Sequence, residues 1–234
     1  MRFDMTRGKP ASLLARFALP LIFSSMLQQL YTPCDSAIVG RLLGENAFAA
    51  VGAAAFLHGI PLSILLGCTQ GFGVAVGQRF GAKDDGGVNR FFSTALLLGG
   101  GATVAINLLA VIFAEPMIGL FLGDGLTEAV QVGAASLRVR SAFVVSMYLL
   151  CAWRAAISGM GNAVIPMISG FLELGLKTAA ILTLPRLLGM QGLYLMDAAA
   201  WIPVALFLGL CYRRILKQKL YLAVRRTVNG SAIS

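Results

Sequence analysis

Six long apolar runs, separated by short polar segments, constrain this chain more than any other feature. Hydrophobic residues make up 58% of the sequence and charged residues only 12%, whereas about 25% charged residues is usual in a soluble domain. A lipid-exposed backbone must satisfy its hydrogen bonds within its own segment, which a helix does. The sequence therefore predicts an all-α fold, a polytopic membrane helix bundle of about six spans of roughly 20 residues each. The predicted spans are Phe17–Leu43, Phe48–Gly77, Phe91–Phe113, Ala142–Ile157, Val164–Leu188 and Leu193–Tyr212.

The fourth predicted span is short unless Ala129–Val139 extends it. The six runs together make residues 17–212 one membrane domain. An N-terminal segment, residues 1–16, precedes this domain, and a basic tail, residues 213–234, follows it.

Lys and Arg are distributed unequally between the two sides that six spans define. With the N-terminus in the cytoplasm, cytoplasmic segments hold four basic residues before the first span, three after the second, one near the end of the fourth and six in the tail. These are 14 of the 19 Lys and Arg residues, and such an excess is typical of cytoplasmic loops. We therefore expect a multi-pass protein of the plasma (inner) membrane with both termini in the cytoplasm.

Asp35 is an acidic residue within the first apolar run. An ionised carboxylate near the centre of a membrane helix costs roughly 2.5–3.5 kcal/mol on insertion scales, so such residues usually face a cavity and carry a function. Gln28 precedes Asp35 by seven residues and shares roughly its helix face. We predict that Asp35 binds a proton or another cation and that Gln28, Gln29 and Tyr31 line the same cavity. For the two glutamines, an interhelical hydrogen bond that only joins helices is an equal alternative.

Other polar residues within the runs favour structural roles. Glu173 and Lys177 are four residues apart in the favourable order for an ion pair on one helix, so we predict that they pair, with a cavity role as the alternative. His58 has no convergent carboxylate pattern and is expected to pack with its polar atoms satisfied. Asp197 lies near the outer end of the last run, where water is close.

Two pairs of glycines lie on the second run, each pair spaced by four residues: Gly67 with Gly71, and Gly73 with Gly77. Small residues at this spacing allow membrane helices to approach closely. We predict that this face packs against another helix, and it is a candidate contact in a homodimer.

The sequence offers no pattern of an enzyme. It has no nucleophile–base pair, no cluster of metal ligands and no phosphate-binding loop, and its four cysteines have no paired spacing. The net charge of +9 forms no basic stripe interleaved with aromatic residues, so nucleic acid is not an expected partner. Because the sequence has no phosphate-binding loop for a nucleotide, any transport by this chain would have to use an ion gradient. The coupling ion would be H+ or Na+, with no other cofactor. Protons are slightly favoured because Na+ needs several further oxygen ligands, and few are evident near Asp35.

Several motifs in residues 5–90 resemble the first two spans of the multidrug and toxic compound extrusion (MATE) family. They are Met5-Thr-Arg-Gly-Lys, Leu14-Ala-Arg-Phe-Ala-Leu-Pro20, Gln28-Gln29-Leu-Tyr31, Asp35-Ser-Ala-Ile-Val-Gly40, and Gly71-Phe-Gly73 followed by Gln78-Arg-Phe-Gly81-Ala-Lys83. The resemblance places Asp35 on the acidic residue that is proposed to bind the coupling ion in this family.

The second half resembles a different part of the family, the closing spans of its C-terminal lobe. The motifs are Arg154 with Gly159-Met-Gly161-Asn, Pro166-Met-Ile-Ser-Gly170-Phe-Leu-Glu173, and Ala200-Trp201-Ile. Full-length members have twelve spans in two six-helix lobes, so the chain resembles the start of one lobe joined to the end of the other. An acidic residue that the family often carries on its fifth span has no match here, where Glu173 and Lys177 stand instead.

The resemblance implies a cation-coupled antiporter that exports organic cations or drugs across the inner membrane. Two alternatives remain, a lipid-linked precursor flippase of related fold and a truncated MATE fragment that is inactive alone. The implied partners are the lipid bilayer, a small cationic or amphipathic organic substrate, and a second lobe. That lobe would come from a homodimer or from a separate MATE lobe.

Overall fold

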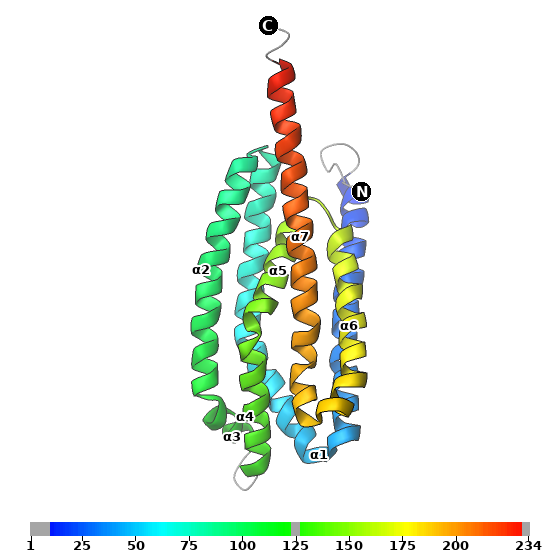
Figure 1. Ribbon diagram of the computed structural model, residues 1–234, viewed down its shortest axis with the longest axis vertical. Coiled ribbons are helices and arrows are strands. Elements are labelled where there is room, and N and C mark those ends of the chain that lie inside the picture. The colour runs from blue at the N-terminus through cyan, green and yellow to red at the C-terminus, as the bar shows by residue number, and fades with distance from the viewer. Residues whose placement is uncertain (1–9, 123–126, 231–234) are drawn as a thin grey trace.

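The computed structural model of the protein describes the backbone of residues 10–122 and 127–230, and most side chains within 52–120 and 130–217. This part of the chain is built from seven α-helices arranged as an elongated bundle (Figure 1). The helices are α1 (Pro10–Gly81), α2 (Asp85–Ile112), α3 (Ala114–Leu122), α4 (Thr127–Ala142), α5 (Val144–Gly159), α6 (Val164–Leu188) and α7 (Met190–Gly230). The prediction of an all-α membrane bundle is confirmed.

Helix α1 contains both of the first two predicted spans in one 72-residue element. A straight helix of that length would measure about 108 Å, more than three times the roughly 30 Å of a bilayer's hydrocarbon core. Figure 1 shows instead that the α1 ribbon runs to the lower end of the bundle, bends and returns. The single helix therefore supplies two antiparallel passes.

The described residues contain four helical segments that are long and apolar enough to cross a membrane: Gly52–Gly81, Gly86–Ile112, Val164–Leu188 and Tyr194–Lys217. The fourth predicted span, Ala142–Ile157, corresponds to α5, and the chain bends by 49° at the break between α4 and α5. Residues 129–139, which would lengthen the short fourth run, lie on α4, on the other side of this break. Most side chains of the first predicted span lie outside the described residues.

Helix ends follow from local sequence. The Asp84 carboxylate accepts a hydrogen bond of 2.8 Å from the N–H of Gly87 and caps the start of α2. Before α6, the Asn162 side chain accepts hydrogen bonds of 3.2 Å from the N–H groups of both Val164 and Ile165. Helix α7 continues well beyond the predicted last span, and Figure 1 shows its C-terminal part extending past the other helices.

The interior is formed mainly by α1, α2, α5 and α7. Tyr148 on α5 is buried and donates a hydrogen bond of 2.9 Å to the carbonyl oxygen of Ala95 on α2. Phe92 on α2 packs on Tyr212 of α7, with ring centroids 4.8 Å apart. The outward faces are apolar instead, with Leu97 79% exposed and Leu120 85% exposed. Such exposure is expected of a surface that faces lipid rather than water.

Two of the four predicted packing glycines join α1 to α5. A Cβ atom added to Gly73 would lie 2.9 Å from the carbonyl oxygen of Ala155, and one added to Gly77 would lie 3.0 Å from that of Gly159. Gly67 and Gly71 have open space around them within 4 Å. The close approach is confirmed for Gly73 and Gly77, and the open faces of Gly67 and Gly71 stay a candidate contact with another chain.

Gly73→Ala is expected to destabilise the bundle by about 1–3 kcal/mol, because the new methyl group meets backbone that cannot move aside easily. Gly71→Ala is the matched control on the same helix. It should be neutral or slightly stabilising, because alanine is the better helix former by roughly 0.5–1 kcal/mol. Thermal unfolding in mild detergent would measure both variants, and equal midpoints would contradict the packing seen here.

Candidate functional site

Four helices converge on a buried carboxylate, that of Asp197. Asp197 on α7 forms ion pairs with Arg140 on α4 (Nη1–Oδ2 distance 2.8 Å) and with Lys177 on α6 (Nζ–Oδ1 distance 2.9 Å). Its Oδ2 has no hydrogen-bond partner among the described residues. The side chains are 3%, 14% and 12% exposed, respectively. His58 on α1 is buried and lies within electrostatic reach of Arg140 and Asp197. We call these four residues the Asp197 cluster.

The burial of Asp197 corrects the expectation that water is close to it. Asp197 is only 2% exposed, because α7 begins at Met190 and packs its first turns against α4 and α6. A buried carboxylate is tolerated when cations and hydrogen bonds compensate for its lost hydration. Arg140 and Lys177 supply that compensation from two other helices.

His58 packs as expected, but its polar atoms are not satisfied. Its imidazole ring stacks on the indole of Trp201, with centroids 6.4 Å apart and planes at 16°. Both ring nitrogens are buried and have no hydrogen-bond partner among the described residues. The imidazole therefore places two nitrogens that form no hydrogen bond with the described residues in the interior, near Arg140 and Asp197.

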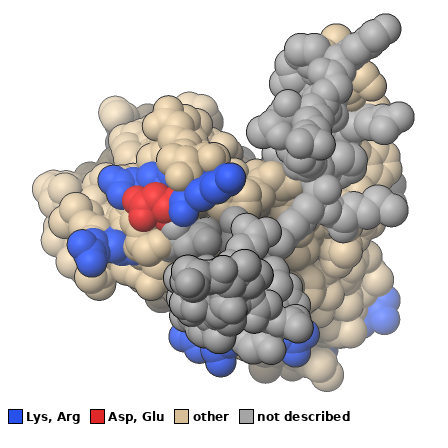
Figure 2. Space-filling view, turned by 90° about the horizontal axis from the view of Figure 1, so that it is seen from above, with Lys and Arg blue, Asp and Glu red and all other residues tan. Residues whose placement is uncertain are grey.

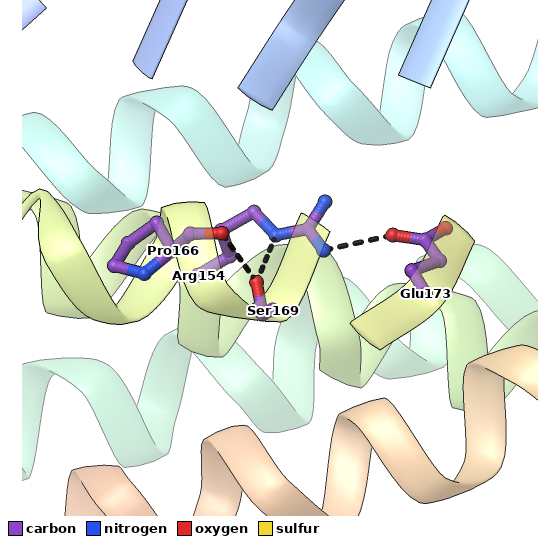
Figure 3. A network of polar contacts seen from close by, with 4 residues as sticks. All are labelled: Arg154, Pro166, Ser169 and Glu173. Carbon is purple, nitrogen blue, oxygen red and sulfur yellow. Dashed lines mark hydrogen bonds and ion pairs between the residues drawn. The ribbon is translucent and has the colours of Figure 1, made fainter. Parts of the chain in front are cut away.

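A second buried ion pair lies between α5 and α6 (Figure 3). Arg154 Nη2 is 2.8 Å from Glu173 Oε2, with side chains 16% and 5% exposed. The Ser169 hydroxyl accepts from Arg154 Nε at 3.1 Å and donates to the carbonyl oxygen of Pro166 at 2.7 Å. The guanidinium is thus held by two side chains of α6, in a fixed orientation.

The partners of Glu173 and Lys177 differ from those predicted. Glu173 binds Arg154, and Lys177 binds Asp197, so each charge is matched across helices. Arg140 and Arg154 both lie largely inside the bundle, although the count of basic residues placed the one near the end of the fourth run, Arg154, in a cytoplasmic segment. One signal pointed to Arg154, because it falls within the fourth apolar run, where a charge needs a partner.

The predicted ion-binding region lies on the first pass of α1. Its backbone is helical, and Gln29 is exposed. The side chains of Gln28, Tyr31 and Asp35 lie outside the described residues. Their predicted roles therefore stay predictions.

A multi-pass helical bundle with a broken helix and charges at membrane depth has the features of a membrane transport protein. The MatE family profile matches residues 20–181 of the chain. The chain therefore belongs to the MATE family, as its motifs indicated.

Individual relatives agree with this assignment. The chain is 27% identical over 177 residues to the probable multidrug resistance protein YoeA of Bacillus subtilis (strain 168), which covers 75% of this chain and 37% of that protein. Its fold is similar to that of the Vibrio cholerae MATE transporter VcmN in the bent form, with a TM-score of 0.81, 18% identity, and coverage of 92% and 49% of the two chains. It is also similar to a MATE structure in the bent conformation, with a TM-score of 0.77, 23% identity, and coverage of 88% and 46%. The chain thus spans less than half the length of these relatives.

Proposed function

We propose that the chain is one lobe of a cation-coupled antiporter that exports small organic compounds, cationic or amphipathic, across the plasma membrane. The match to the MATE family over residues 20–181 carries this proposal. Asp35 would bind the coupling ion, with H+ favoured over Na+. Gln28, Gln29 and Tyr31 would line its surroundings. The chain would act in transport rather than as an enzyme.

The half length of the chain bears on how it would work. Transporters with repeated lobes bind substrate at the interface between the repeats, and this chain covers 37–49% of its relatives. We propose that a second lobe completes the path, either from a second copy of this chain or from a separate MATE lobe. The exposed Gly67 and Gly71 on α1 are a candidate contact.

Native mass spectrometry in mild detergent is expected to show a dimer, and cells that express the chain alone are expected to export ethidium faster than cells with empty vector. Efflux by a protein that is only monomeric would contradict the two-lobe argument. A dimer without drug efflux would favour the lipid-linked precursor flippase. Neither dimer nor efflux would favour a fragment that is inactive alone.

Reporter fusions after Gly8 and after Ser231 are both expected to read as cytoplasmic. Helix α1 starts and α7 ends at the same end of the bundle (Figure 1). That end carries the exposed Arg79, Lys83 and Arg90 of the α1–α2 region, and Figure 2 shows basic side chains predominating over acidic ones on it. Cytoplasmic loops carry such an excess. A periplasmic reading at the C-terminus alone would mean an odd number of spans.

A further inference from the structure

An apolar groove lies between the second pass of α1 and α2, with α3 at one end of it. Its volume is about 490 Å³, within the range of roughly 300–1,000 Å³ that is usual for small-molecule sites. The described residues that line it are all apolar, whereas most ligand sites also contain a few polar groups that orient the ligand. The part of any molecule that fills this groove is therefore hydrocarbon.

The groove is elongated along the helices. Four lining residues of α1, from Leu57 to Ile64, are spaced at i, i+3, i+4 and i+7, and four of α2, from Ile106 to Phe113, have the same spacing. This spacing keeps side chains on one face of a helix, and seven residues of helix rise about 10 Å. Two apolar faces of this length thus form the two walls of the groove.

The groove is open on the outside of the bundle. Leu57 and Pro61 are buried at its bottom, and Ala110 on α2 is half-buried and short. Ile64 is 55% exposed and Leu109 is 58% exposed, so both border the opening. An exposed apolar face of a membrane bundle meets lipid, and acyl chains therefore have direct access to the groove.

An exposed ion pair marks the polar boundary beside the groove. Glu115 lies in sequence between Phe113 and Pro116, which both line the groove, and α3 is at the end of the bundle away from the termini (Figure 1). Arg138 Nη2 is 2.8 Å from Glu115 Oε1, and the side chains are 48% and 56% exposed. Exposed charges near helix ends lie at the level of the lipid headgroups rather than among the acyl chains. The groove thus begins near the headgroups and continues along the hydrocarbon.

We propose that this groove binds an acyl chain of a phospholipid from the leaflet on the α3 side, with a zwitterionic headgroup of the ethanolamine type at Arg138 and Glu115. The phosphate binds the Arg138 guanidinium, and the ammonium group binds the Glu115 carboxylate. An exposed ion pair contributes little to stability, so both side chains can take the headgroup as a partner at small cost. The lipid is a resident ligand of the bundle and is not exported.

Charge and shape favour a lipid over the exported compound in this groove. The proposed substrates are cationic or amphipathic, and none of the described residues that line the groove is acidic. The long axis of the groove follows the helices, which is also the direction of acyl chains in a bilayer. One apolar chain with a polar end of both charges fits the groove and the boundary together.

The test titrates the full chain, delipidated in mild detergent, with palmitoyl-oleoyl phosphatidylethanolamine and counts bound lipid by native mass spectrometry. Ala110→Phe places a large side chain in the groove and should raise the apparent Kd roughly tenfold or more. Ala105→Phe is the matched control, because Ala105 is exposed on the same helix and does not line the groove, and it should leave the Kd unchanged. Glu115→Gln should abolish the preference for the ethanolamine over the glycerol headgroup.

A second measurement leaves the groove unfilled. Leu109→Trp places a fluorophore at the opening, and Leu108→Trp places one on the neighbouring exposed residue, which does not line the groove. At one brominated phospholipid per protein, the fluorescence of Leu109→Trp should be quenched and that of Leu108→Trp should not. This pair decides the question if Ala110→Phe does not fold.

Several results would overturn the proposal. Equal quenching of the two tryptophan variants, or equal Kd values for Ala110→Phe and Ala105→Phe, would mean that lipid only surrounds the bundle. Retention of ethidium that is lost in Ala110→Phe, with lipid binding unchanged, would assign the groove to the exported compound. Loss of a dimer in Ala110→Phe, with lipid binding unchanged, would make the groove an interface between copies. Lipid binding is measured without transport, so a failure of export does not affect this result.

Discussion

Cells that express the Asp35→Asn variant are expected to lose gradient-driven ethidium export entirely, while inserting the same amount of protein into the membrane. Asparagine keeps the size and the hydrogen bonding of aspartate but cannot take up or release a proton or pair with a cation. A carboxylate in a low-dielectric cavity is suited to loading and releasing a proton, because burial and ionisation oppose each other there. Dye export at matched protein levels is the measurement.

Asp84→Asn is the matched control for this substitution. Asp84 is exposed and caps α2, and asparagine is an equally good cap, so export should stay at the unsubstituted level. Undiminished export by Asp35→Asn would remove Asp35 from the mechanism. If the unsubstituted chain exports nothing, the interpretation as an inactive fragment is preferred instead.

The second large effect is expected from Glu173→Gln, which should destabilise the bundle by about 3–5 kcal/mol. The substitution leaves the Arg154 guanidinium buried between α5 and α6 without its counter-charge (Figure 3). Much of the loss comes from the cost of an uncompensated buried cation rather than from the attraction that is removed. Equilibrium unfolding in detergent measures the change.

The chain contains a matched exposed pair for comparison. Arg138 and Glu115 also have an N–O distance of 2.8 Å, but their side chains are 48% and 56% exposed. Glu115→Gln should therefore cost only about 0–1 kcal/mol, because water screens and replaces the lost partner. A similar cost for both substitutions would show that burial does not set the strength of the Arg154–Glu173 pair.

Hydropathy alone predicted most of the elements. The fifth predicted span, Val164–Leu188, has the bounds of α6, because a spanning helix is defined by a local apolar run between polar ends. The break between α4 and α5 was not predicted, and neither was the short helix α3. A break in a helix within the membrane is tolerated only where neighbouring helices shield the exposed backbone from lipid. A run of apolar residues does not specify which helices are neighbours, so neither feature follows from hydropathy.

The sequence also determined that charged side chains lie within the membrane and need partners, and its motifs placed the chain in its family. Which partners they take was decided by the tertiary structure alone. Glu173 and Lys177 are adjacent on one helix face, yet Glu173 pairs with a residue 19 positions away in sequence and Lys177 with one on α7. Spacing along the sequence identifies only the neighbours of a residue on its own helix. These ion pairs join different helices, because the packing of the helices brings the opposite charges together away from water.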